Sequence, residues 1–491
     1  MSGTGAPTAR RWGPAAVLVL VLVLVLLVVL VGFGLVALQA RDRTAAPSTV
    51  PSGSPSAVPS AGPSLTDPPE RPALLAELEA TAPAPSPAGL DALVTSALAA
   101  PALGGRLSVS VLDATTGEPL LERDARTPLL PASTAKIATA VAVLTALDPD
   151  DRLTTRVLAG PAPGEVVLVG GGDPTLAAPR PDGAAPGYPA PAQLADLAAQ
   201  VRTALGAAPP TRVLVDESLY SGDRTGPGWR PTYVSQGAVA PVVPLLLDGG
   251  RVRPDRLARS PEPGLAAGAA LAALLVPGAP VEVARGAALP GAAELGAVQS
   301  PTIAQLVEQM LQRSDNDLSE ALARHVALAT GRPASFEGAA QAVREVLGPS
   351  LQAAGVAPDA VALVDGSGLS RLNRLQPAAV SRLLARAAAD DGSGDVERLQ
   401  PVLSGLPVGG FSGTLEDRYR EAAAALPAAG VLRAKTGTLD GVSALAGLLR
   451  TADGRLLAFD LTADAVPTGA NRQAEAALDA LAGALAGCGC R

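Results

Sequence analysis

Histidine and cysteine are scarce in this chain of 491 residues. It has one histidine, His325, and two cysteines, Cys488 and Cys490, at the extreme C-terminus. A zinc site built from clustered Cys and His residues is therefore excluded, and so is a Cys–His protease unless it used that tail. A Ser-His-Asp triad has a single candidate histidine, and we interpret His325 as an ordinary, satisfied helix residue.

Positive charge and aromatic residues are limited as well. The chain has 46 acidic and 38 basic residues, a net charge of −8, and no basic run. This balance argues against nucleic acid as a partner and against a polybasic membrane patch. Aromatic residues make up 2% of the chain and apolar types 48%, so Ala, Val and Leu must pack the core of about two to four domains.

Lysine is the rarest charged residue, because Lys136 and Lys435 are the only two and every other basic residue is arginine. An ammonium group can lose its proton when it is desolvated and acts as a compact point charge, whereas a guanidinium group does neither. The two lysines are therefore candidates for chemistry. Alanine precedes both of them, which excludes a Walker-type phosphate loop.

A long apolar run lies near the N-terminus, at residues 15–38, after a polar segment at 1–14 that we expect in the cytoplasm. A helix of this length spans roughly 36 Å, more than the ~30 Å hydrocarbon core of a membrane. We predict an uncleaved transmembrane anchor with the rest of the chain outside the cell membrane. The alternative is a signal peptide removed within residues 1–40, which would leave a secreted protein, but its apolar region is normally shorter and Leu38 stands where a small residue is wanted.

The remaining chain divides by composition into four segments. Residues 39–73 are rich in Ala, Pro and Ser, cannot bury enough surface to fold, and are predicted to be a disordered tether. We expect a main domain in two parts, 74–154 and 301–491, separated by a mostly β inserted region at 155–300. The local patterns predict a hairpin over 106–125, a helix over 131–147, a helix over 317–331 that Gly331 ends, three antiparallel strands near the C-terminus, and a last helix from about 471 to 485.

The first motif that can carry chemistry is Ser133-Thr134-Ala135-Lys136, at the start of a predicted helix. Residues i and i+3 of a helix share a face, so the hydroxyl of Ser133 and the amine of Lys136 can meet. A serine beside an amine of lowered pKa is an activated nucleophile that needs no histidine. The spacing is common by itself, so the motif alone is a weak signal.

Two further motifs follow in the chain. Ser314-Asp315-Asn316 lies in the break between two predicted helices, where Ser314 and Asn316 can point into one cleft; alone, it also fits a plain helix cap. Lys435-Thr436-Gly437-Thr438 ends an apolar strand, where Gly437 permits close approach of another backbone or a ligand and a strand edge can bind an extended peptide. Alone, it also fits a solvated strand end.

Together the three motifs are far more specific than any one of them. Ser-x-x-Lys, Ser-x-Asn and Lys-Thr-Gly, in this order, resemble the motif set of serine β-lactamases and penicillin-binding proteins. Three more segments are similar to the D-alanyl-D-alanine carboxypeptidase/endopeptidase family of class C low-molecular-mass penicillin-binding proteins: VGGGDPTL (169–176), VDGSGLSRLNR (364–374) and FSGTLEDR (411–418). The resemblance covers roughly residues 75–491.

The resemblance implies a role for each motif. Ser133 would be the acylating nucleophile and Lys136 its general base, while Ser314 and Asn316 would relay protons and hold the peptide. It implies an α+β fold of the penicillin-binding/serine β-lactamase type, with an antiparallel sheet flanked by helices, a helical subdomain and the inserted β-rich region. It also implies no cofactor and no metal.

The third motif would bind the substrate. Lys435, helped by Thr436, would hold the terminal carboxylate of a peptidoglycan stem peptide, and Gly437 completes the motif. The backbone N–H groups of Ser133 and Thr438 would form the oxyanion hole, a donor pair worth about 3–4 kcal/mol per donor. Two residues of the 364–374 loop, Asp365 and Arg371, are added to the candidate site residues without an assigned role.

The function implied is a membrane-tethered serine D-alanyl-D-alanine carboxypeptidase, with endopeptidase activity left open, that β-lactam antibiotics inhibit covalently. Two alternatives stay open. One is a membrane-anchored penicillin-recognising sensor that is acylated without turnover. The other is a β-lactamase, against which stand the long insertion and the lack of the E-x-x-L-N pattern of class A enzymes.

Overall fold

The computed structural model of the protein describes residues 82–180, 187–253, 255–389 and 395–489. All of them belong to the unit Leu75–Arg491. The predicted anchor at 15–38 and tether at 39–73 lie outside the described residues. Within the described ranges, no helix is long and apolar enough to cross a membrane.

The first sheet joins the two ends of the described chain. Its order is β10-β11-β12-β1-β2, and every neighbouring pair is antiparallel. The predicted hairpin and the three predicted C-terminal strands are confirmed. The bounds are β1 Ser108–Asp113, β2 Pro119–Arg123, β10 Leu432–Leu439, β11 Val442–Arg450 and β12 Leu456–Ala463.

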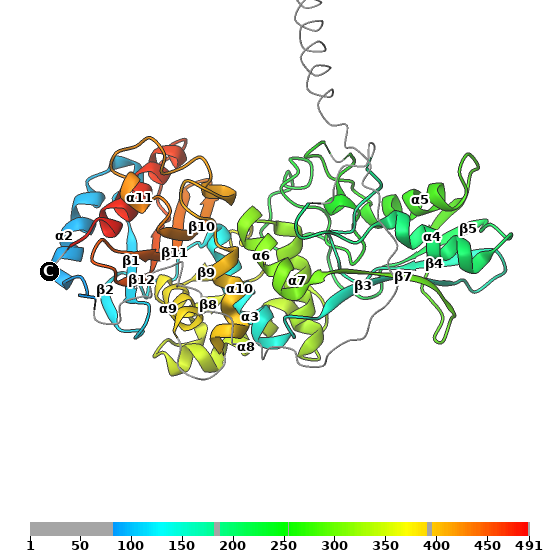
Figure 1. Ribbon diagram of the computed structural model, residues 1–491, viewed down its shortest axis with the longest axis horizontal. Helices are drawn as coiled ribbons and strands as arrows, with labels where there is room; N and C mark the ends of the chain where they lie inside the picture. Colours follow the sequence, from blue (N-terminus) through cyan, green and yellow to red (C-terminus); the bar gives the residue numbers. More distant parts are fainter. Residues whose placement is uncertain (1–81, 181–186, 254, 390–394, 490–491) are drawn as a thin grey trace, which may run out of the picture. The chain divides into compact units, whose positions relative to one another are not determined.

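Helices cover both faces of this sheet (Figure 1). The hydrophobic core on one face includes Val111 and Phe459, and the core on the other includes their strand neighbours Leu112 and Ala458. Because successive side chains of a strand point to opposite faces, helices on both sides explain why almost every residue of β1, β11 and β12 is buried, polar ones included. The helices on the first face are α2 Pro87–Leu98 and α11 Asn471–Ala486.

The second face carries a helical layer around α3 (Ala135–Ala146), of which residues 135–144 are all buried. Small side chains along α3 allow its neighbours to approach closely on every side. The neighbours are α6 Ile303–Arg313, α7 Asn316–Ala329, α8 Phe336–Ala353, α9 Pro377–Ala388 and α10 Asp395–Gly405. A two-stranded sheet, β8 Val361–Ala362 with β9 Arg374–Leu375, lies at the ends of the 364–374 loop.

The helix predicted over 131–147 is confirmed, although it begins with a 3-10 turn, η2 (Ala132–Thr134). The helix predicted over 317–331 is α7, and Gly331 follows its C-cap with a φ of +71°. Helix α11 matches the last predicted helix. The other 3-10 turns are η1 Pro101–Leu103, η4 Asp248–Gly250, η5 Pro358–Ala360, η6 Gly413–Leu415 and η7 Leu426–Ala428.

The chain between α3 and α6 forms a second sheet with the order β6-β5-β4-β3-β7. It enters through β3 and leaves through β7, and these strands pair from Arg152↔Thr302 onward. The pairs β4–β5 and β5–β6 are parallel, and a parallel pair needs a crossover, usually a helix. The strands are β3 Arg152–Ala159, β4 Glu165–Val169, β5 Arg212–Asp216, β6 Glu282–Arg285 and β7 Glu294–Thr302.

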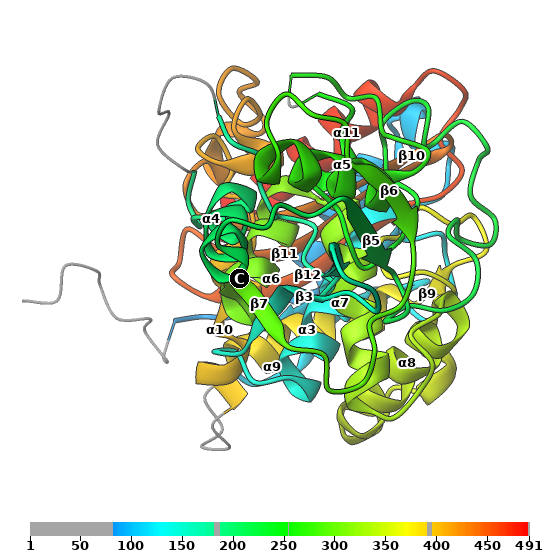
Figure 2. The ribbon, with the colours of Figure 1, turned by 90° about the vertical axis from the view of Figure 1, so that its right-hand side faces the viewer.

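Two helices supply those crossovers, α4 (Leu194–Leu205) and α5 (Pro263–Leu275), and both pack against the second sheet (Figure 2). The expectation of a mostly β insertion was therefore wrong in part, since the segment is mixed α/β. Both helices consist largely of Ala and Leu, which are strong helix formers. The proline and glycine residues of the flanking loops made these helix-forming segments difficult to recognise in the sequence.

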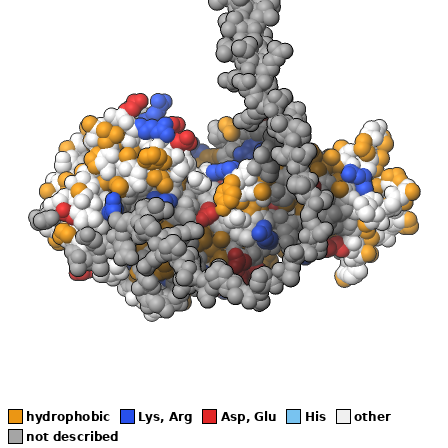
Figure 3. Space-filling model, in the orientation of Figure 1, with side chains coloured by type: hydrophobic (Ala, Val, Ile, Leu, Met, Phe, Trp, Pro, Cys, Tyr) orange, Lys and Arg blue, Asp and Glu red, His pale blue; other side chains and the backbone are white. Residues whose placement is uncertain are grey.

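The surface carries charges of both signs close together. On the face in Figure 3, basic and acidic side chains are interspersed among hydrophobic and other groups. Several exposed arginines pair with carboxylates, as Arg156 does with Glu294 at 3.2 Å and Arg332 with Glu345 at 2.5 Å. Exposed pairs of this kind contribute only about 0–1 kcal/mol each to stability.

Candidate active site

Ser133 lies on the 3-10 turn η2, directly before α3, and its side chain is half-buried. The preceding Ala132 has a φ of +48°, an unfavourable backbone conformation for a residue with a Cβ. Two glycines pack against this turn so closely that neither position has room for a Cβ. A Cβ on Gly368 would lie 1.9 Å from the Ala132 carbonyl oxygen, and one on Gly437 would lie 2.7 Å from the Pro131 carbonyl oxygen.

Lys136 is fully buried one turn after Ser133. Its Nζ donates to Asn316 Oδ1 at 2.6 Å, to the Ser367 carbonyl at 2.6 Å, and to Ser133 Oγ at 3.2 Å. Burial lowers the pKa of Lys136 to about 8, although Asp365 and other nearby carboxylates act in the opposite direction. A base with a pKa near neutrality is suited to accept the proton of a serine hydroxyl.

The Ser314-Asp315-Asn316 motif forms the break between α6 and α7. Ser314 ends α6 with a φ of +55°, and the Asp315 carboxylate caps α7 by accepting the Leu318 N–H at 3.0 Å. Asn316 therefore begins α7 with its side chain toward Lys136. Its Nδ2 donates to the Ala238 carbonyl of the inserted segment at 2.8 Å, so Asn316 bridges the insertion and Lys136.

Lys435 and Gly437 point from β10 toward η2, and the Lys435 side chain is fully buried. Lys435 Nζ donates to the Thr436 carbonyl at 2.9 Å. Burial holds the pKa of Lys435 well below its usual range, and the positive charge of Lys136 lowers it further. No carboxylate among the described residues pairs with Lys435, so an incoming carboxylate would favour its protonated form and bind it.

The two threonines of β10 face away from η2. Thr436 Oγ1 lies 3.0 Å from Thr414 Oγ1, which comes from the FSGTLEDR segment, and Thr438 Oγ1 donates to Glu475 of α11 at 2.7 Å. Strand β10 is at the edge of the first sheet. Its beginning is covered by the bridge of Arg433 to Val408, whereas in the described part of the chain no strand pairs with the outer edge of its second half.

The 364–374 loop is folded around the buried carboxylate of Asp365. Asp365 accepts the N–H groups of Gly368 at 2.9 Å and Ser370 at 2.7 Å, and it accepts from Asn373 Nδ2 and Trp229 Nε1 at 2.7 Å each. Asp365 is thus a loop-forming residue rather than an exposed ligand. The half-buried Arg371 donates to the Asp440 carbonyl, in the turn after β10, at 2.9 Å.

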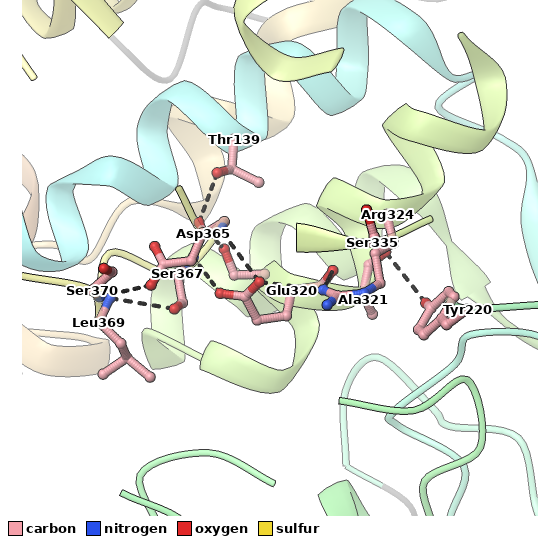
Figure 4. Close-up of polar contacts among 12 residues, drawn as sticks. Thr139, Tyr220, Glu320, Ala321, Arg324, Ser335, Asp365, Ser367, Leu369 and Ser370 are labelled. Carbon is pink, nitrogen blue, oxygen red and sulfur yellow. Dashed lines mark hydrogen bonds and ion pairs between the residues drawn. The ribbon is translucent and has the colours of Figure 1, made fainter. Parts of the chain in front are cut away.

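Sequence reasoning missed a second buried carboxylate, that of Glu320 on α7. Glu320 and the neighbouring Arg324 are each 1% exposed, and Arg324 lies over the ring of Phe336 at 4.1 Å. Figure 4 shows Glu320 between Arg324 and the loop that carries Asp365 and Ser367. The one signal available was the four-residue spacing from Asn316 to Glu320 to Arg324, which places all three on one side of a helix.

His325 and Cys488 lie apart from these residues. His325 is on α7, as predicted, with its ring against Tyr220, and burial lowers its pKa to about 4. The expectation of a satisfied histidine is met only in part: the Gly171 backbone favours the charged ring, but Nε2 is buried without a hydrogen-bond partner among the described residues. Cys488 is disulfide-bonded, and Cys490 lies outside the described residues.

A cavity of about 400 Å³ opens beside the second motif. Ser314, Asp315 and Asn316 line it together with residues of the inserted segment, among them Ala238 and Arg251. This volume falls within the range that holds small-molecule and peptide ligands. The site thus combines a serine hydroxyl in contact with a buried lysine, a cavity, and a strand edge with no partner strand among the described residues.

The profile of the D-Ala-D-Ala carboxypeptidase 3 (S13) family matches residues 90–273 and 256–485. Carboxypeptidase DacB of Mycolicibacterium smegmatis is 42% identical over 417 residues, which cover 84% of this chain and 87% of that protein. A D-alanyl-D-alanine carboxypeptidase of Actinomadura sp. is 30% identical over 444 residues, covering 72% of this chain and 77% of that protein.

Solved structures agree on the fold. Penicillin-binding protein 4 of Haemophilus influenzae matches with a TM-score of 0.62 and 21% identity, covering 77% of this chain and 95% of that one. The predicted penicillin-binding/β-lactamase type of α+β fold is thereby confirmed. The chain belongs to the D-Ala-D-Ala carboxypeptidase 3 (S13) family, as the resemblance of its motifs predicted.

Proposed function

We propose that this protein is a membrane-tethered serine D-alanyl-D-alanine carboxypeptidase that removes the terminal D-alanine from peptidoglycan stem peptides through an acyl-enzyme on Ser133. The observation that carries the proposal is the contact of Lys136 with both Ser133 Oγ, at 3.2 Å, and Asn316 Oδ1, at 2.6 Å. Family membership supports the carboxypeptidase activity.

Lys136 acts as the general base in this proposal. When the amine is neutral, its two hydrogens serve its two shorter contacts, the Asn316 oxygen and the Ser367 carbonyl. The lone pair is then directed at Ser133 Oγ, so the hydroxyl proton can pass to Nζ as Oγ attacks the carbonyl carbon. The D-alanine leaves with a proton, and water later hydrolyses the Ser133 ester and regenerates the hydroxyl. Ser314, whose Oγ forms no hydrogen bond among the described residues, is available to pass that proton.

Lys435 holds the terminal carboxylate of the substrate. The carboxylate would supply the counter-charge that Lys435 lacks among the described residues and would favour its protonated form. The predicted help from the Thr436 side chain does not fit the geometry, because Thr436 Oγ1 faces away from η2 and contacts Thr414 Oγ1. The pairing of opposite charges in a desolvated site favours a substrate with a free C-terminus.

The negative charge that develops on the carbonyl oxygen is stabilised by the backbone N–H groups of Ser133 and Thr438. The absence of a side chain at Gly437 supports this pairing, because it lets β10 approach η2 closely. The rest of the peptide lies along the free edge of β10 and reaches the cavity beside Ser314, in the manner of an added strand.

The anchor at residues 15–38 and the tether at 39–73 complete the proposal. They would hold the catalytic domain outside the cell membrane, within reach of peptidoglycan. β-Lactam antibiotics would acylate Ser133 and inhibit the enzyme covalently. Whether cross-linked peptides are also cleaved, as by an endopeptidase, is decided by substrate assays.

The test is incubation of the purified protein with a penicillin, followed by intact mass and peptide mapping, beside an assay of D-alanine release from a pentapeptide. We expect one covalent adduct on the peptide with Ser133, none in Ser133→Ala, and D-alanine release that the penicillin blocks. A stable adduct without D-alanine release would identify a sensor, and rapid loss of the adduct as hydrolysed penicillin a β-lactamase.

A further inference from the structure

The buried carboxylate of Glu320 lies directly behind the catalytic lysine. Glu320 is four residues after Asn316 on α7, so both side chains leave the same side of the helix. Glu320 Oε1 accepts the Ser367 N–H at 2.9 Å, and Oε2 accepts the Gly366 N–H at 3.2 Å. The carbonyl of Ser367 is in turn an acceptor for Lys136 Nζ at 2.6 Å. One peptide segment thus connects Glu320 to the base.

The same segment is held from its other side by two hydroxyl groups. Thr139 Oγ1 and Ser319 Oγ both donate to the Gly366 carbonyl at 2.7 Å. Figure 4 shows Thr139 pointing toward this loop. Thr139 is three residues after Lys136 on α3, and Ser319 precedes Glu320 on α7. A Cβ on Gly366 would lie 2.7 Å from the Ser319 carbonyl oxygen, so the segment is in close contact with α7. The orientation of the Ser367 carbonyl is therefore fixed by side chains of both helices.

The charged and titratable groups around Glu320 come from four elements. Asp365 lies on the loop in front of it, Arg324 follows it on α7, Lys136 faces it from α3, and Tyr220 comes from the inserted segment. Arg324 Nη1 approaches Glu320 Oε2 at 3.4 Å. The negative charges of Glu320 and Asp365 both favour the protonated form of Lys136.

We propose that Glu320 is a positioning residue for acylation: its carboxylate fixes the Gly366–Ser367 segment so that the Ser367 carbonyl orients Lys136 Nζ toward Ser133. This inference rests on the proposed function, in which Lys136 is the base. A small displacement of Lys136 Nζ relative to Ser133 Oγ would lower the acylation rate strongly. The hydrogen bonds of Glu320 should therefore affect the chemical step and not the affinity for the substrate.

The test compares Glu320→Gln with Glu345→Gln, a control that removes a half-exposed carboxylate from α8. The limiting rate of acylation by a fluorescent penicillin and the dissociation constant of the complex before acylation are measured, with active sites counted by the final adduct. For Glu320→Gln we expect the limiting rate to fall about tenfold or more and the dissociation constant to stay close to that of the wild type. The midpoint of the rate against pH should move to lower pH, because a negative charge near Lys136 is lost.

Glu320→Gln leaves the buried Arg324 without its carboxylate partner, which can prevent folding. A second variant tests the inference in that case. Thr139→Val combined with Ser319→Ala releases the Gly366 carbonyl without changing any charge. Here we expect a lower limiting rate with the pH midpoint unmoved. A wild-type limiting rate in folded Glu320→Gln, or in the double variant, would overturn the inference. Failure of the wild type to form an adduct on Ser133 would instead overturn the proposed function.

Discussion

Lys136 Nζ lies 2.6 Å from Asn316 Oδ1, although 180 residues separate the two in sequence. The intervening chain includes the second sheet and its loops, and the carbonyl of Ala238 in one of those loops accepts from the same Asn316 amide at 2.8 Å. The insertion therefore helps to fix Asn316, a residue of the domain that the insertion interrupts. This relationship ties the orientation of the base to the amide of Asn316.

The pH dependence of acylation follows from the buried environment of Lys136. Its pKa is lowered to about 8, so the neutral base forms as the pH rises through that value, and roughly a tenth is neutral at pH 7. We expect the rate of acylation by a penicillin to rise through pH 8 and to fall about tenfold per pH unit well below it. Asn316→Asp should move the midpoint to higher pH, because an added carboxylate beside Nζ favours the ammonium form. An unmoved midpoint in a folded Asn316→Asp protein would show that another group controls the profile.

Because β10 approaches η2 closely, we predict that a methyl group added at Gly437 lowers both the stability and the acylation rate. In Gly437→Ala the new Cβ would lie 2.7 Å from the Pro131 carbonyl oxygen, so the strand or the turn must move. We expect a loss of about 1–3 kcal/mol in the free energy of unfolding and a clear loss of acylation. The control is Gly348→Ala on α8, where the Cβ would meet nothing within 4 Å and helix propensity predicts a gain of up to about 1 kcal/mol. Denaturant unfolding and the acylation rate measure both variants, and equal behaviour of the two would contradict the predicted contact.

Much of the first sheet and its helices could be predicted, because their signals are local. The hairpin β1–β2, the strands β10–β12 and helix α3 follow from apolar periodicity and turn residues within short windows. Lys136 and Lys435 were conspicuous only because every other Lys/Arg position of the chain is arginine. The helices α4 and α5 were missed because Pro and Gly around them suggested loops and strands.

Burial, in contrast, is a tertiary property that single-sequence patterns do not show. Glu320 and Arg324 look like an ordinary surface pair at i and i+4, yet both are 1% exposed. Asp365 was selected from its motif, and three of its hydrogen-bond partners lie in the same loop, but the fourth, Trp229, is 136 residues away in sequence. That partner becomes visible only when the inserted segment is placed beside the 364–374 loop.

The predicted anchor has a direct test at the N-terminus. If residues 15–38 are an uncleaved transmembrane helix, the mature protein keeps Met1 or Ser2 and stays with the membrane fraction after a high-salt wash. N-terminal sequencing and fractionation of the full-length protein in its own cells measure this. An N-terminus found between residues 38 and 50 would show that a signal peptide has been removed.

The two lysines differ in mechanism, and the same substitution should separate them. Lys136 must be neutral to accept the proton of Ser133, and an arginine cannot be deprotonated in this way. Lys136→Arg should therefore abolish acylation, and it also places a larger group in a fully buried position. Lys435 needs only to remain positive toward a carboxylate, so Lys435→Arg should keep part of the acylation rate, with the loss mainly in substrate recognition.

The measurement is the acylation of both variants by a fluorescent penicillin, with circular dichroism to confirm that each is folded. Because both side chains are fully buried, the two variants carry a similar steric burden and serve as controls for each other. If folded Lys136→Arg acylates as fast as Lys435→Arg, Lys136 is not the base, and the proton of Ser133 must pass to another group.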